Sequence, residues 1–115
     1  MDITIYHHPH CSNSRQTLAA IRAAGHAPRI VDYLIAPPSR EELERMLAAA
    51  GMRPRAAMRT KESLYTELGL DGDAVSDAVL IDAMLAHPVL INRPFVLTPK
   101  GVRLCRPPET VREIL

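Results

Sequence analysis

Apolar and polar residues alternate over the first positions of the chain, and this pattern predicts a short strand at residues 2–6, DITIY. From residue 12 to residue 24 the apolar positions change to helical spacing, with Leu18 and Ile21 on one face and a glycine after the end. Residues 29–33, RIVDY, predict a second strand. The chain therefore opens with a strand, a helix and a strand.

The middle third of the chain is predicted to be entirely helical. Ser39 stands three residues before Glu42, which is the spacing of a capping box, and opens a helix that ends near a glycine. Residues 54–70 indicate one or two short helices. Ser76 can cap a further helix that runs to about His87.

The last part of the chain returns to strands. After VLIN at residues 89–92, the segments PFVLT (94–98) and VRLC (102–105) flank a PKG turn, which predicts a hairpin. Residues 107–115 begin with prolines and carry an acid in the first turn, a pattern typical of a final helix.

The order strand-helix-strand, helices, strand-strand-helix (βαβ … ββα) is that of a thioredoxin-like α/β fold. It predicts a mixed sheet of about four strands in a single domain, residues 1–115, with a helical insertion at approximately 36–88. That fold places a cis-proline facing its active thiol just before the first hairpin strand. The corresponding residue here is Pro94.

The length and the net charge of the chain limit the classes of protein to which it can belong. A chain of 115 residues fits one domain, and a net charge of +1 argues against a nucleic-acid binder, which needs a concentrated basic surface. No apolar run approaches the roughly 20 residues of a membrane span. The chain starts directly on a strand, without a signal-peptide pattern, and its two cysteines are widely separated. We therefore expect a cytoplasmic protein with no membrane association.

The segment HHPHCSNSR, residues 7–15, places Cys11 where the first strand meets the first helix. Unpaired N–H groups and the positive end of the helix dipole favour a thiolate there. Ser12, Asn13 and Ser14 add small polar donors, and Arg15 adds positive charge. The alternative is an inert, buried cysteine, but the polar surroundings favour a nucleophile.

A metal site at this segment is not expected. His7, His8, His10 and Cys11 lie together in the sequence, yet zinc ligands usually come from two separated pieces of chain, and no second cluster exists. Strand alternation points His7 and His8 in opposite directions. Of the three histidines, His7 is the one expected nearest the thiol.

The thiol chemistry is expected to use one cysteine. Position 14 is Ser14, where a dithiol oxidoreductase would carry the second cysteine of a Cys-x-x-Cys motif. Cys105 lies at the end of a predicted strand and is expected to be a packed structural thiol, although an internal disulfide route through it stays open. A monothiol mechanism with glutathione and a glutaredoxin-type partner follows more naturally.

The segments IYHHPHCSNSRQTL, MRTKESLYTELGL and HPVLINRPFVLTPKGVRLCRPPETVREIL resemble the glutaredoxin-coupled arsenate reductases over essentially the whole chain. The resemblance implies that Cys11 is the nucleophile and that Arg59, Arg93 and Arg106 form the oxyanion site. It also matches His7 to the family's His-x-x-x-Cys spacing. KESLY, RPPE and an end shortly after the last helix resemble a shorter, housekeeping-type subgroup.

The implied activity is reduction of arsenate, an arsenic-detoxification reaction in which glutathione is the co-substrate and no cofactor is bound. Arginine forks match the oxygens of a tetrahedral dianion. Two alternatives stay open. One is a glutathione-linked thiol oxidoreductase of the same fold, acting on a glutathionylated protein or a small disulfide. The other is a non-enzymatic regulator that contacts RNA polymerase, although CSNS lacks the Cys-x-x-Cys switch typical of that class.

Overall fold

The computed structural model describes all 115 residues, which form two compact units. The first unit contains residues 1–36 and 93–115, and the second contains residues 37–92. The second unit begins close to the start of the predicted helical insertion and extends a few residues beyond its predicted end.

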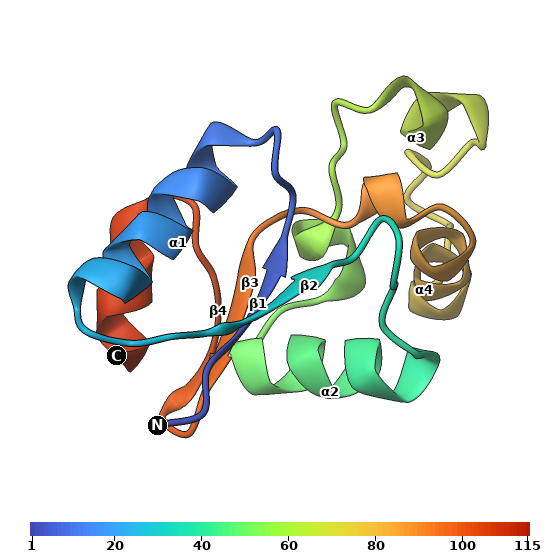
Figure 1. The fold of residues 1–115 in the computed structure, drawn as a ribbon. Coiled ribbons are helices and arrows are strands. Elements are labelled where there is room, and N and C mark those ends of the chain that lie inside the picture. Colours follow the sequence, from blue (N-terminus) through green and yellow to red (C-terminus); the bar gives the residue numbers. More distant parts are fainter. The chain divides into compact units, whose positions relative to one another are not determined.

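The first unit is a four-stranded mixed sheet with two helical segments (Figure 1). The strand order is β2-β1-β3-β4; β1 runs parallel to β2 and antiparallel to β3, and β3 and β4 form an antiparallel hairpin. This order and these directions confirm the predicted thioredoxin-like α/β fold. The elements are β1 (Thr4–His7), α1 (Ser12–Ala23), β2 (Arg29–Asp32), β3 (Phe95–Thr98), β4 (Gly101–Leu104) and the 3-10 helix Pro108–Ile114.

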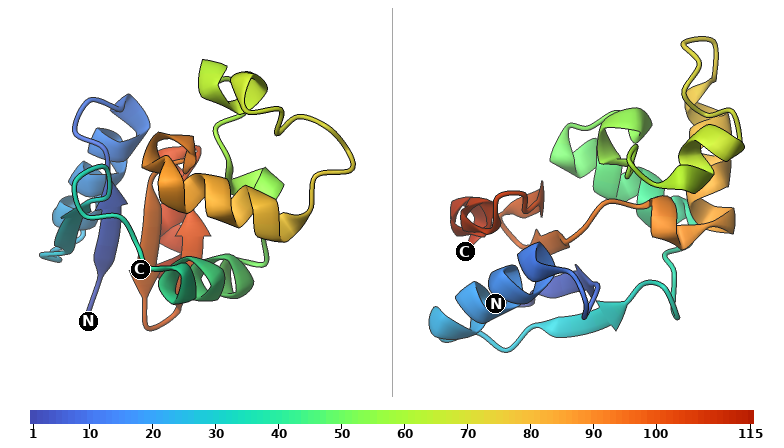
Figure 2. Two further views of the ribbon diagram at one scale, coloured as in Figure 1. Left: turned by 90° about the vertical axis from the view of Figure 1, so that its right-hand side faces the viewer. Right: turned by 90° about the horizontal axis from the view of Figure 1, so that it is seen from above.

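Helix α1 and the C-terminal 3-10 helix lie side by side on one face of this sheet (Figures 1 and 2). The alternation of β1 turns its odd-numbered positions toward them, so that Ile5 packs beneath Leu18 and Ile21. The core on this face consists of Ile3, Ile5, Leu18, Ile21, Val96, Cys105, Val111 and Ile114, all of them buried.

Two proline-containing segments depart from the predicted elements. Residues 107–115 form a 3-10 helix rather than an α-helix, and residues 89–90 belong to a second 3-10 helix, Pro88–Leu90, instead of an extended segment. In both helices a proline occupies one of the first positions, where its fixed φ and missing N–H fit the start of a helical turn. A hydrophobic run in the sequence does not by itself show whether such a segment forms a 3-10 helix, an α-helix or an extended segment.

The second unit is helical throughout, as predicted for the middle third of the chain. A single β-bridge pairs Met58, just after the 3-10 helix Pro54–Ala57, with Ile91 near the end of the unit. Its elements are α2 (Arg40–Ala50), the 3-10 helix Pro54–Ala57, α3 (Ser63–Glu67), α4 (Asp77–Ala86) and the 3-10 helix Pro88–Leu90.

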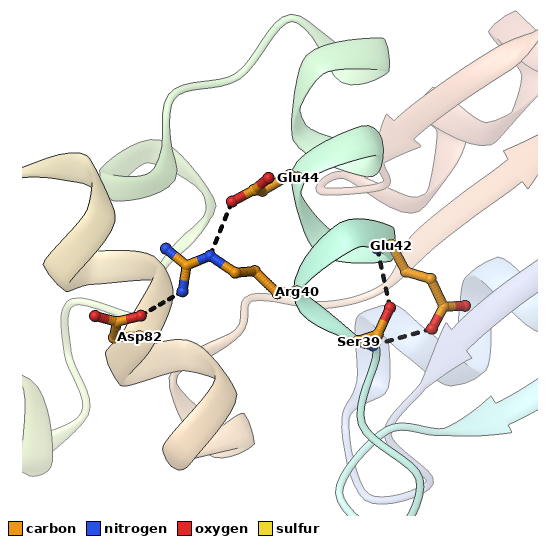
Figure 3. Close-up of polar contacts among 5 residues, drawn as sticks. All are labelled: Ser39, Arg40, Glu42, Glu44 and Asp82. Carbon is orange, nitrogen blue, oxygen red and sulfur yellow. Dashed lines mark hydrogen bonds and ion pairs between the residues drawn. The ribbon is translucent and has the colours of Figure 1, made fainter.

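The predicted capping box at the start of α2 is present (Figure 3). The Ser39 hydroxyl accepts the Glu42 backbone N–H at 3.1 Å, and Glu42 Oε1 accepts the Ser39 backbone N–H at 3.0 Å. Figure 3 also shows Arg40 bridging two helices: its Nε donates to Glu44 Oε1 at 3.0 Å within α2, and its Nη1 contacts Asp82 on α4. No helix has the length and apolar character needed to cross a membrane.

Candidate active site

Cys11 is the N-cap residue of α1, directly after the loop that follows β1. Its backbone is extended, with φ −95° and ψ 123°, and its N–H donates to the His8 carbonyl at 3.1 Å. The side chain is partly exposed. At an N-cap, the side chain faces the unpaired N–H groups of the first helical turn, so the fold places the sulfur where negative charge is stabilised.

Two arginines predicted for the oxyanion site lie close to this sulfur. Arg106 Nη1 is 3.9 Å from Cys11 Sγ, and the same nitrogen donates to the Arg93 carbonyl oxygen at 3.0 Å. Arg93 is buried, with a relative exposure of 8%, whereas Arg106 is exposed. The first unit therefore brings together Cys11 and two of the three predicted arginines.

The pKa of the Cys11 thiol results from opposing influences. Partial burial raises the pKa, but the backbone N–H of Ser14 and the guanidinium groups of Arg93 and Arg106 lower it, and the net pKa lies below the ordinary thiol value. Because the thiolate is the nucleophilic form, the lowered pKa favours attack on an electrophilic atom at a lower pH than an ordinary thiol allows.

Cys105 has the opposite environment. It is fully buried in the core of the first unit, and burial raises the pKa of its thiol to about 12, with Glu113 adding to the shift and Arg103 opposing it. Both cysteines are free thiols. The structural role predicted for Cys105 agrees with this packing, and the inert alternative describes Cys105 rather than Cys11.

His7 supports the loop through Ser14. The His7 Nδ1 and the Ser14 hydroxyl oxygen are 2.6 Å apart, and the same hydroxyl accepts the His8 backbone N–H at 3.0 Å. His7 and Ser14 are both buried, and burial lowers the pKa of His7, with Asp32 opposing the shift. This pair ties the end of β1 to the first turn of α1, and it thereby fixes the loop that carries Cys11.

The remaining predicted site residues fall into two groups. Pro94 follows Arg93 through a cis peptide bond, as the topology predicted, and its carbonyl accepts the Cys105 N–H at 2.9 Å. A second cis bond, Arg106–Pro107, was not predicted. Arg59 lies in the second unit, where its Nε pairs with Glu62 Oε2 at 3.4 Å, so its role in oxyanion binding stays a prediction.

His8 and His10 contact each other in the loop, where the His10 N–H donates to His8 Nδ1 at 3.1 Å. His10 is exposed and His8 is partly exposed. No group of three or more histidine, cysteine, aspartate or glutamate side chains is arranged to hold a metal ion.

The contact between Asn13 and Arg106 is not indicated by the sequence. With the Asn13 amide oriented so that its oxygen faces the donor-only guanidinium of Arg106, this oxygen accepts hydrogen bonds from Nη1 at 3.2 Å and Nη2 at 3.3 Å. Asn13 follows the nucleophile by two positions, which marked it as a polar neighbour of the thiol. Its partner comes from the other end of the chain, and no local pattern indicates that pairing.

The fold and this site define a thioredoxin-like protein with a single activated thiol beside two arginines. The chain belongs to the ArsC family, whose family model matches residues 6–114.

Individual relatives agree with this assignment. The chain is 58% identical to the arsenate reductase of Rhizobium meliloti (strain 1021) over 115 residues, all of this chain and 82% of that protein. It is 54% identical to the arsenate reductase of Escherichia coli (strain K12) over 114 residues, 99% of this chain and 81% of that protein. The solved structure of an arsenate reductase from Vibrio cholerae superposes with a TM-score of 0.96 at 48% identity, covering 100% of this chain and 98% of that one.

Proposed function

We propose that this protein is an arsenate reductase that uses glutathione as co-substrate and glutaredoxin as its reducing partner. The observation that carries the proposal is the Cys11 thiol, whose pKa is lowered at a helix N-terminus beside the Arg93 and Arg106 side chains. The relatives named arsenate reductase match this chain over nearly its full length, which supports arsenate as the substrate.

The proposed reaction starts with the oxyanion bound by arginine forks, with Arg93 and Arg106 as binding residues and Arg59 as the third. The Cys11 thiolate attacks As(V) and forms a sulfur–arsenic bond, and water or hydroxide leaves. A glutathione thiolate then attacks the Cys11 sulfur of this adduct. The sulfur–arsenic bond breaks and its electron pair goes to arsenic, which leaves as arsenite.

The electrons balance in this sequence. Arsenic gains two electrons as it passes from As(V) to As(III), and the two thiols supply them by forming a Cys11–glutathione disulfide. Glutaredoxin then reduces this mixed disulfide by thiol exchange and restores the Cys11 thiol. Such a cycle needs a reducing compartment, so we place the protein in the cytoplasm as part of the proposal.

A coupled assay tests this function. NADPH oxidation would be followed with arsenate, glutathione, glutaredoxin and glutathione reductase, using the wild type and Cys11→Ser, and omitting each component in turn. We expect turnover that requires arsenate, glutathione and glutaredoxin and that is lost in Cys11→Ser. No arsenate-dependent turnover, together with rapid glutathionylation of Cys11, would contradict the proposal and would assign the thiol to a disulfide or glutathionylated substrate.

A further inference from the structure

The position of the Arg106 side chain needs an explanation, because Arg106 is exposed and yet lies at the sulfur. An exposed arginine has many rotamers, and confining it to one of them costs side-chain entropy. Three groups contact its guanidinium in the first unit: the Arg93 carbonyl oxygen at 3.0 Å, Cys11 Sγ at 3.9 Å and the Asn13 amide oxygen. Of these, only the Asn13 oxygen is contacted by two guanidinium nitrogens.

The contacts divide the guanidinium into used and available N–H groups. Asn13 receives one hydrogen from Nη1 and one from Nη2, and the second hydrogen of Nη1 points to the Arg93 carbonyl at 3.0 Å and is shared with the more distant Cys11 sulfur at 3.9 Å. A guanidinium has five N–H donors, so Nε–H and the remaining hydrogen of Nη2 are left. These two groups lie on the edge of the guanidinium opposite Nη1, so the contacts to Asn13 and to the Arg93 carbonyl fix which part of the group faces the sulfur.

We propose that Asn13 is a positioning residue for Arg106. Its amide oxygen holds the guanidinium with Nη1 toward the Cys11 sulfur and keeps the positive charge of Arg106 beside the thiolate and the tetrahedral oxyanion. Asn13 acts through Arg106 and does not itself touch the reacting atoms. The kinetic part of this inference rests on the proposed arsenate reductase function; the effect on the thiol does not.

The choice of a neutral acceptor has a physical consequence. A carboxylate at position 13 would also accept two hydrogen bonds from Arg106, but its negative charge would raise the pKa of a neighbouring thiol and repel an anionic substrate. The Asn13 amide fixes the same geometry without this charge.

Two substitutions test the role of the Asn13 oxygen. Asn13→Ala removes the side chain, and Asn13→Leu keeps a similar volume without an acceptor. Both should raise the pKa of Cys11, measured as the pH midpoint of its alkylation by iodoacetamide without any substrate. Both should also raise KM for arsenate roughly threefold to tenfold, as expected for the net loss of one ordinary hydrogen bond, with kcat changed less than twofold. Gln16→Ala, which removes an exposed amide on the same helix, is the matched control.

A double-mutant cycle with Arg106→Ala separates positioning from a general effect on folding. If Asn13 acts through Arg106, Asn13→Ala should shift neither the alkylation midpoint nor KM further when Arg106 is already alanine. Equal shifts in both backgrounds would overturn the proposal, as would unchanged values in Asn13→Ala. If the wild type does not turn over arsenate, the alkylation midpoints still decide the role of Asn13 while the proposed function fails.

Discussion

Arg106 Nη1 lies 3.9 Å from Cys11 Sγ, although 95 positions separate the two residues in the sequence. The contact joins the segment after β4 to the N-cap of α1. It places a fixed positive charge beside a thiol that already faces the helix N-terminus. The reactivity of Cys11 therefore depends on residues from both ends of the chain.

The first prediction concerns the charge of Arg106. Thiolate forms as the pH rises through the thiol pKa, so a lowered pKa makes Cys11 reactive at lower pH. Arg106→Ala should move the midpoint of the alkylation-rate profile to higher pH. Arg112→Ala, which removes an exposed arginine from the same unit, is the control and should leave the midpoint in place. An unmoved midpoint in Arg106→Ala would show that Arg106 does not stabilise the thiolate.

The second prediction concerns the two cysteines. Native protein should take up one alkyl group at neutral pH, on Cys11, because Cys105 is fully buried and its pKa is raised to about 12. Unfolded protein should take up two, and mass spectrometry distinguishes the two results. Cys105→Ala should retain most activity and lower the free energy of unfolding by about 1 kcal/mol. Loss of turnover in this variant would instead support an internal disulfide route.

Local patterns in the sequence predicted most of the first unit. Alternation and helical spacing identified β1 and α1, and the order of elements predicted the mixed sheet and the cis bond at Pro94. The capping box at Ser39 was predictable because both of its partners lie within one helical turn. Each of these features is determined either by residues that are neighbours in the chain or by the order of the elements.

The missed features depend on how separate elements pack against one another in space. Asn13 receives its role from Arg106, and the hydrogen bond between His7 and Ser14 depends on the packing of β1 against α1. The segment Pro108–Ile114 forms a 3-10 helix packed beside α1, and a hydrophobic pattern does not distinguish it from an α-helix. Arg59 was predicted from the family resemblance alone, and its role in oxyanion binding is a question for experiment.

The third prediction compares two polar contacts of α2 (Figure 3). Ser39→Ala removes the cap and should lower the free energy of unfolding by about 1 kcal/mol, because the Glu42 N–H loses its acceptor. Asp82→Asn weakens an ion pair between exposed side chains and should change stability much less, with the difference shrinking further in high salt. Urea unfolding of both variants measures this. A larger loss of stability in Asp82→Asn than in Ser39→Ala would contradict the conclusion that the cap is the stronger of the two contacts.

The last prediction tests oxyanion binding through the arginine fork. Phosphate has the tetrahedral oxygens of arsenate without its redox chemistry, so it should compete with arsenate and should slow alkylation of Cys11 in the wild type. Arg106→Ala should weaken this protection by about 1 kcal/mol, or roughly fivefold in phosphate concentration, after allowance for the exposure of Arg106. Arg106→Lys keeps the charge but loses the fork, and it should restore protection only in part. Equal protection of the wild type and Arg106→Ala would mean that Arg106 serves the thiol alone and does not bind the oxyanion.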